Sequence, residues 1–419
     1  MFLENLAFFM EILRFQHAFS IQKAVKTPYM DEIFHVKQMQ TYCKGDYLRW
    51  DDKITTPPGM YGIHLGILWI ANKVAVGCDL MSLRTLNVIT DVFSTLLVFL
   101  SLYLTLEKRH KTSAMVSFLS LTIRQTNVVW VLFLISISIF PPHIFHEKLQ
   151  AANLSVWNPS ARNANFFGRE NNYLRFIKSL SRFLIEQYMY IIKIIWPYVI
   201  IVFLFGIFVI YNKGIALGDK ANHTVGIHLL QLFYFSVFTA FWGSPHLLTK
   251  NMILHFFKQS FGNRWAWFRT CGIMIIMGLI VHFNTKEHPF LISDNRHYVF
   301  YIWRKTIKVH PAAKYVAVPF YYASAWAILN KLIFYQKISY ILSFIVAIIL
   351  VLVPVSLLEF RYFIVPYLLW RFSIQSTHKL RLYAEALLFL CINYITVNIF
   401  LYKPFFWESE PKNLQRFMW

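Results

Sequence analysis

Long apolar runs recur along this chain of 419 residues, and many of them are long enough to cross a lipid bilayer. A helix needs roughly 20 mostly apolar residues to cross about 30 Å of hydrocarbon. The clean runs are 85–106, 191–211, 315–335, 338–358 and 382–402. Less clean runs are 60–78, 114–140, 228–248 and 266–283, and 361–372 has half the length. The pattern predicts an all-α polytopic membrane protein with about 9–11 transmembrane helices.

The charge composition agrees with a membrane protein. Lys and Arg total 41 against 20 Asp and Glu, a net charge of +21, yet only 15% of residues are charged and 57% are hydrophobic. In a soluble chain such an excess favours nucleic acid as partner, but beside membrane spans cations set topology and contact anionic headgroups. We therefore predict a lipid bilayer and no nucleic acid as partner. The distribution of basic loops does not decide the orientation.

Polar segments interrupt the runs within what we predict to be one membrane domain, residues 1–419. They are the first polar loop (residues 28–58), a polar loop with an amphipathic helix (141–190) and the motif loop (284–314). Charged residues interrupt the N-terminal run 2–20, which fits a poor first span or an interfacial helix. Asn153 and Asn222 match the glycosylation pattern, which only a lumenal loop could use. The four cysteines are far apart and indicate neither a disulfide framework nor a zinc site.

The first polar loop concentrates Asp31, Glu32, His35, Trp50 and Asp51 in one segment that ends at paired prolines. Adjacent carboxylates in a loop are most often solvated surface. A carboxylate held at a membrane face among aromatic rings could instead act as a general base toward a sugar hydroxyl.

The motif loop contains Asp294, Asn295, Arg296 and His297 among aromatic residues. One interpretation is a basic aromatic belt at the membrane interface. The other is a binding site, in which Arg296 and His297 hold a phosphate while Asp294 and Asn295 bond sugar hydroxyls.

Two further arginines stand apart from these loops. Arg124 lies within an apolar run, where it either faces a polar cavity or extends to the headgroups. Arg361 follows Glu359 and is either half of a weak interfacial pair or part of a phosphate site. His228 and Gln231, at a transition from loop to span, are interpreted as interfacial, since no set of residues has metal-ligand spacing. The sequence contains no phosphate loop or dinucleotide fingerprint.

Five blocks together resemble the dolichyl-phosphoglucose-dependent α-1,2-glucosyltransferase family of asparagine-linked glycosylation. The blocks are YMDEIFH (29–35), WDDKITTPPG (50–59), IRQTN (123–127), HPFL with DNRHY (288–298) and QRFMW (415–419). The resemblance implies a GT-C type helix bundle in the endoplasmic reticulum membrane, with catalytic loops that face the lumen.

The implied reaction transfers glucose from dolichyl phosphate β-glucose to the diglucosylated dolichyl-diphosphate oligosaccharide, with inversion. The resemblance places the base on the first polar loop, with Asp31 as first choice and Glu32 as second; Arg296, His297 and Arg361 are our phosphate candidates by charge. No metal or cofactor is expected, and the protein is expected to act as a monomer. The family carries further membrane segments after Leu106, so an inactive shortened form is one alternative. A membrane transporter or channel-associated protein is the other.

Overall fold

The computed structural model describes residues 20–71, 78, 80–140, 172–220, 225–374 and 378–418. The N-terminal run, Asn153, Asn222 and Trp419 lie outside these described residues. Contacts divide the chain into two compact units. Unit 1 is Met1–Val131, Pro197–His223 and Val397–Arg416; unit 2 is Leu132–Trp196, Thr224–Thr396 and Phe417–Trp419. The prediction of a single membrane domain stays a prediction, and each unit is described by itself.

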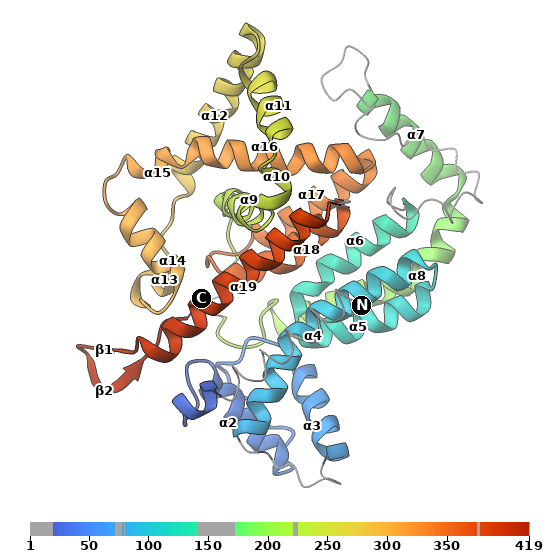
Figure 1. The fold of residues 1–419 in the computed structure, drawn as a ribbon. Helices are drawn as coiled ribbons and strands as arrows, with labels where there is room; N and C mark the ends of the chain where they lie inside the picture. Colours follow the sequence, from blue (N-terminus) through green and yellow to red (C-terminus); the bar gives the residue numbers. More distant parts are fainter. Residues whose placement is uncertain are drawn as a thin grey trace. The chain divides into compact units, whose positions relative to one another are not determined.

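Unit 1 is organised around an antiparallel helix pair, α4 (Leu80–Leu106) and α5 (His110–Ile123), which lie side by side (Figure 1). Small buried hydroxyls join the pair: Ser113 Oγ donates to Ser101 O over 2.7 Å and lies 2.8 Å from Thr105 Oγ1. Small polar residues of this kind let apolar helices approach closely. The other elements are α2 (Glu32–Cys43), α3 (Gly59–Ala71), η2 (Gln125–Asn127) and parts of α6 (Val128–Ile139), α8 (Tyr188–Asn212) and α19 (Lys379–Tyr402).

Unit 2 is built on α9 (Leu230–Trp242), which packs against α16 (Val318–Tyr335) through Phe233 and Tyr321, whose ring centroids are 5.4 Å apart. A helical hairpin, α11 (Lys250–Phe261) and α12 (Arg264–Asn284), lies beside α16 (Figure 1). The Asn263 side chain caps α12 by accepting from Ala266 N at 2.8 Å. The remaining elements are α7 (Asn172–Glu186), α10 (Ser244–Leu247), α13 (Pro289–Ser293), α14 (Tyr298–Ile302), η4 (Trp303–Ile307), α15 (Ala313–Val316), α17 (Ile338–Leu352), η5 (Phe360–Phe363) and α18 (Ile364–Ser373).

The predominantly helical fold is confirmed and is consistent with a helical membrane protein, whereas the number of spans stays a prediction. Within the described ranges, four helical segments are long and apolar enough to cross a bilayer: Tyr188–Asn212, Arg264–Asn284, Ala313–Tyr335 and Lys379–Tyr402. Other predicted spans form shorter apolar helices. The run 338–358 is helical only to Leu352, because Pro354 follows. The run 114–140 breaks at Arg124, whose backbone is extended (φ −138°, ψ 116°).

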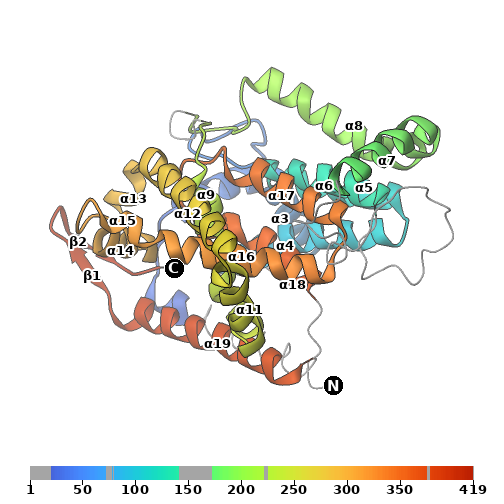
Figure 2. The ribbon, with the colours of Figure 1, turned by 90° about the horizontal axis from the view of Figure 1, so that it is seen from above.

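Two regions differ from the expected pattern. The first polar loop contains a helix, α2, which extends from Glu32 to Cys43. The all-α prediction also missed a short antiparallel hairpin after α19, β1 (Phe405–Trp407) with β2 (Glu410–Gln415), in which Phe405 pairs with Gln415 (Figure 2). Pro404 cannot extend α19, so the chain leaves the helix there. The predicted amphipathic helix near 173–190 is confirmed as α7.

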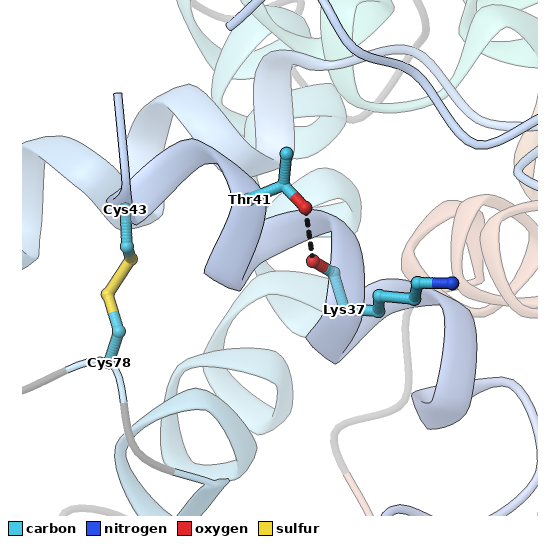
Figure 3. The surroundings of a disulfide bond; sticks show 4 residues. All are labelled: Lys37, Thr41, Cys43 and Cys78. Atoms are coloured by element: carbon cyan, nitrogen blue, oxygen red, sulfur yellow. Dashed lines mark hydrogen bonds between the residues drawn. A yellow bond between two sulfur atoms is a disulfide. The ribbon is translucent and has the colours of Figure 1, made fainter. Parts of the chain in front are cut away.

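A disulfide that the cysteine spacing did not indicate closes part of unit 1. Cys43, the last residue of α2, bonds to Cys78, just before α4 (Figure 3). The two cysteines are 35 residues apart in the chain, and their Cα atoms are 6.7 Å apart. The disulfide therefore links the end of α2 to Cys78, which precedes α4. In the last turns of α2, Thr41 Oγ1 donates a hydrogen bond to Lys37 O (Figure 3).

Candidate functional site

Asp31 stands on a turn with an unusual backbone. The preceding residue, Met30, has a φ of 53°, in the left-handed region that bulky residues rarely adopt. Asp31 is exposed at the start of α2, and its carboxylate has no hydrogen bond or ion pair with any residue that the structure describes. A strained turn therefore presents a carboxylate that no described residue pairs with, the combination expected where geometry serves function.

Glu32, the next residue, is fully engaged. Arg84 of α4 donates from Nε to Glu32 Oε1 at 3.0 Å and from Nη2 to Oε2 at 2.7 Å. Arg84, which is 8% exposed, also donates to the carbonyls of Val25 and Thr27. Glu32 Oε2 in addition accepts from Tyr29 N at 3.0 Å. Such paired, charge-assisted bonds are strong and directional, so Glu32 and Arg84 fix the chain on both sides of Asp31.

A second anchor holds Tyr29, two residues before Asp31. Arg416 N donates to Tyr29 Oη at 2.9 Å, and Tyr29 Oη lies 3.2 Å from Arg416 O. The Arg416 guanidinium donates to Phe400 O and Leu401 O at the end of α19 and to Ala24 O. The described part of the terminal QRFMW block therefore supports the turn of Asp31.

The other predicted residues of the first polar loop mainly organise it. His35 Nδ1 is 2.6 Å from Tyr61 Oη, and Trp50 packs edge-on against the same ring, with centroids 5.8 Å apart. Asp51 Oδ1 accepts from Lys53 N at 3.0 Å, an Asx turn. Asp51 N donates to the buried Gln38. Roles in substrate binding for these residues stay predictions.

The Arg124 block contacts the same loop. Gln125 Nε2 donates to Thr55 O at 2.8 Å, and Asn127 Nδ2 donates to Ser94 Oγ at 3.1 Å. A Cβ atom at position 59 would collide with Thr122 of α5. Only glycine at this position therefore permits so close an approach of the loop to α5. The structure thus brings together, within unit 1, two blocks that the sequence analysis treated separately.

In the motif loop of unit 2, Asp294 is fully paired. Arg296 donates from Nε to Asp294 Oδ1 at 2.8 Å and from Nη2 to Oδ2 at 2.7 Å, and His297 Nε2 lies 3.5 Å from Oδ2. Burial alone would raise the pKa of Asp294, but the hydrogen bonds from His297 and Arg296 and the Arg296 charge outweigh it and hold the pKa well below its usual range. Asp294 therefore compensates most of the charge that was predicted to hold a phosphate.

The same loop is braced by the C-terminal residues. Met418 N donates to Arg296 O at 2.5 Å, and the Phe417 ring lies against Tyr298, with centroids 4.6 Å apart. The predicted pairing of Arg361 with Glu359 is also present, and Arg361 lies over the Tyr362 ring. The Arg361 side chain is 43% exposed, and an ion pair this exposed stabilises a protein little.

Sequence reasoning missed Arg84 and Arg416, which hold the turn of Asp31. Arg84 immediately precedes the clean run 85–106, and an isolated cation at such an edge is a signal for a buried carboxylate partner. Among the described residues, no three His, Cys, Asp or Glu side chains lie close enough to hold a metal ion.

Comparison with known proteins agrees with the resemblance seen in the sequence. The sequence model of the DIE2/ALG10 family matches residues 25–90 and 89–372, two segments that meet inside α4. A human protein named Dol-P-Glc:Glc(2)Man(9)GlcNAc(2)-PP-Dol alpha-1,2-glucosyltransferase is 32% identical over 464 aligned positions, covering 96% of this chain and 95% of that protein. A protein of the same name from Arabidopsis thaliana is 31% identical, covering 95% and 96%.

A Yarrowia lipolytica protein of that name is 29% identical, with coverage of 94% and 93%. No solved structure matched the chain. Because the family model and the relatives span most of its length, this chain belongs to the DIE2/ALG10 family.

Proposed function

We propose that this protein is an inverting α-1,2-glucosyltransferase that uses dolichyl phosphate glucose. Its acceptor is the diglucosylated dolichyl-diphosphate oligosaccharide, as the names of its relatives specify for those proteins. The observation that carries the proposal is Asp31, whose carboxylate has no partner among the described residues and lies on a turn anchored on both sides. The proposal includes a GT-C bundle with about 9–11 spans in the endoplasmic reticulum membrane.

Asp31 acts as the general base in a single in-line displacement. It accepts the proton of the attacking acceptor hydroxyl as the new oxygen–carbon bond forms at the anomeric carbon. The bond from that carbon to the donor phosphate breaks on the opposite face, and the phosphate leaves as an anion that nearby cations stabilise. A β-linked donor thereby gives an α-linked product. Glu32 is a positioning residue, since Arg84 occupies both of its carboxylate oxygens.

The remaining predicted residues keep supporting roles in the proposal. All of them keep a substrate-binding role: His35, Trp50, Asp51 and Arg124 in unit 1, and Asp294, Asn295, Arg296, His297 and Arg361 in unit 2. The disulfide Cys43–Cys78 supports a lumenal position for the first polar loop, because disulfides persist in oxidising compartments such as the endoplasmic reticulum lumen.

Complementation tests the proposal. Cells that accumulate the diglucosylated lipid-linked oligosaccharide should form the triglucosylated product when they express this protein, but not its Asp31→Asn variant. Asp46→Asn, which alters another exposed carboxylate of the same loop, is the matched control and should restore conversion. Failure of the wild-type chain to restore conversion would contradict the proposal. Solute transport by proteoliposomes without any lipid-linked sugar would support the transporter alternative instead.

A further inference from the structure

A small pocket opens in unit 2 between the start of α9, the end of α12 and the motif loop. It has about 320 Å³ of empty space, counted with its open mouth. Because that volume includes open solvent, the enclosed part of the pocket is much smaller and admits one small group, not an oligosaccharide. The residues that matter for its chemistry are His228, Gln231, Tyr234, Lys286, His288 and Trp303.

Gln231 lines this pocket, and its side-chain amide has a fixed orientation. The residue is 3% exposed, and its Nε2 donates to the carbonyls of Val355 at 3.2 Å and Leu357 at 3.1 Å. These two bonds fix the orientation of the Gln231 amide, since the reversed amide would place Oε1 against the two carbonyl oxygens. Its Oε1 is buried and has no partner among the described residues. A buried acceptor without a partner is destabilising, so a ligand that brings an O–H group to this oxygen gains a bond.

The lining of the pocket also carries positive charge. Lys286 is exposed and forms no ion pair within the described residues. Burial, together with the charges of Lys286 and His288, lowers the pKa of His228, which precedes α9. Glu287 does not compensate this charge, because its carboxylate accepts from Trp303 Nε1 at 3.0 Å and pairs with Lys308 at 3.1 Å. The pocket therefore favours an anion.

Trp303 and Tyr234 complete the walls. Trp303 is 4% exposed, and its N–H is occupied by Glu287, so the ring contributes apolar surface to the pocket. An apolar lining with a few polar groups that point inward is the usual composition of a ligand site. An anion that also carries a hydroxyl matches all of these features.

We propose that this pocket binds the phosphosugar end of the lipid-linked donor, with Lys286 at the phosphate and Gln231 Oε1 accepting from a sugar hydroxyl. The proposal rests on the proposed function. It moves the main phosphate contact from Arg296, whose charge Asp294 compensates, to Lys286.

Binding by the purified full-length protein in nanodiscs tests this assignment. The probes are a short-chain polyprenyl phosphate glucose, the same polyprenyl phosphate without sugar, and an anionic phospholipid in the disc. Lys286→Met should weaken binding of both polyprenyl probes at least about tenfold, the effect of one charged hydrogen bond. Lys305→Met, which alters another exposed lysine of the motif loop, is the control and should leave both unchanged.

Gln231→Met should weaken only the sugar-bearing probe, and the KM for the acceptor should stay constant in both pocket variants. Equal binding by Lys286→Met and Lys305→Met, or full displacement of the glucose probe by the phospholipid, would overturn the assignment. If the wild-type protein binds the probe through Lys286 but transfers no glucose, the proposed function alone fails. If it transfers glucose but both pocket variants bind normally, the pocket assignment alone fails.

Discussion

The first polar loop and the motif loop contain similar charges but pair them in opposite ways. In the first polar loop, Arg84 pairs with Glu32, and Asp31 has no partner within the part of the chain that the structure describes. In the motif loop, Arg296 and His297 both pair with the Asp294 carboxylate. The first arrangement leaves a carboxylate available for proton transfer, whereas the second uses its carboxylate to shape the loop. Composition alone would assign both loops the same role.

This difference in pairing follows from the position in the chain of the arginine that pairs with each carboxylate. Arg84 lies on α4, 52 residues from Glu32 in the chain, whereas Arg296 is two residues from Asp294. A cation supplied from another helix can reach one of two adjacent carboxylates and leave the other. A cation within the same turn pairs with the carboxylate nearest to it.

The largest expected effect is on catalysis at Asp31. Asp31→Asn should lower the turnover number at least about 100-fold, because general-base catalysis typically contributes 10²–10⁴-fold. The midpoint of thermal unfolding in detergent should not move, since the carboxylate has no partner among the described residues. Unchanged turnover would remove Asp31 as the base.

The next effect is on the stability of the Asp31 turn. Arg84→Met should lower the free energy of unfolding by about 3 kcal/mol, because it leaves the partly buried Glu32 carboxylate without its partner. Denaturant unfolding of Arg84→Met, Glu32→Met and the double variant measures the coupling between the two residues. Strict additivity of the single variants would contradict the pairing seen here.

The disulfide should contribute a comparable amount. Cys43→Ser removes a cross-link between residues 35 apart, and cross-links of this kind typically stabilise proteins by about 2–4 kcal/mol. Treatment of the wild-type protein with a reductant should give the same fall in unfolding midpoint. Cys391→Ser, at an exposed free cysteine, is the control and should not change the midpoint. A reductant-resistant midpoint would argue against a stabilising disulfide.

The smallest effect is expected at Asp294. Asp294→Asn should lower the free energy of unfolding by about 1–2 kcal/mol through lost charged hydrogen bonds. Because the pKa of Asp294 is lowered in the folded state, this stabilisation is complete above the unfolded pKa of about 3.9 and is lost as pH falls toward the folded value. The gap between wild type and variant should therefore stay constant from pH 7.5 to about pH 5 and shrink only below about pH 4. A gap that closes above pH 5 would contradict this pairing.

The sequence predicted local features well and long-range partners poorly. Apolar run length located α4, α8, α12, α16 and α19, and a two-residue spacing made the pairing of Arg361 with Glu359 foreseeable. Run length could not show that the chain breaks at Arg124, because the surrounding residues are apolar enough to continue a helix. The partner of Glu32 depends on how α4 packs, and the disulfide depends on how α2 and α3 fold back. Neither is encoded in residue spacing.

The contact between Arg416 and Tyr29 also sets an order of assembly in time. The two residues are 387 positions apart in the chain. At a synthesis rate of about 5–20 residues per second, Tyr29 is synthesised roughly 20–80 s before Arg416. During that interval the turn of Asp31 lacks one of its two anchors, so the first polar loop cannot reach its final structure until residue 416 has been synthesised.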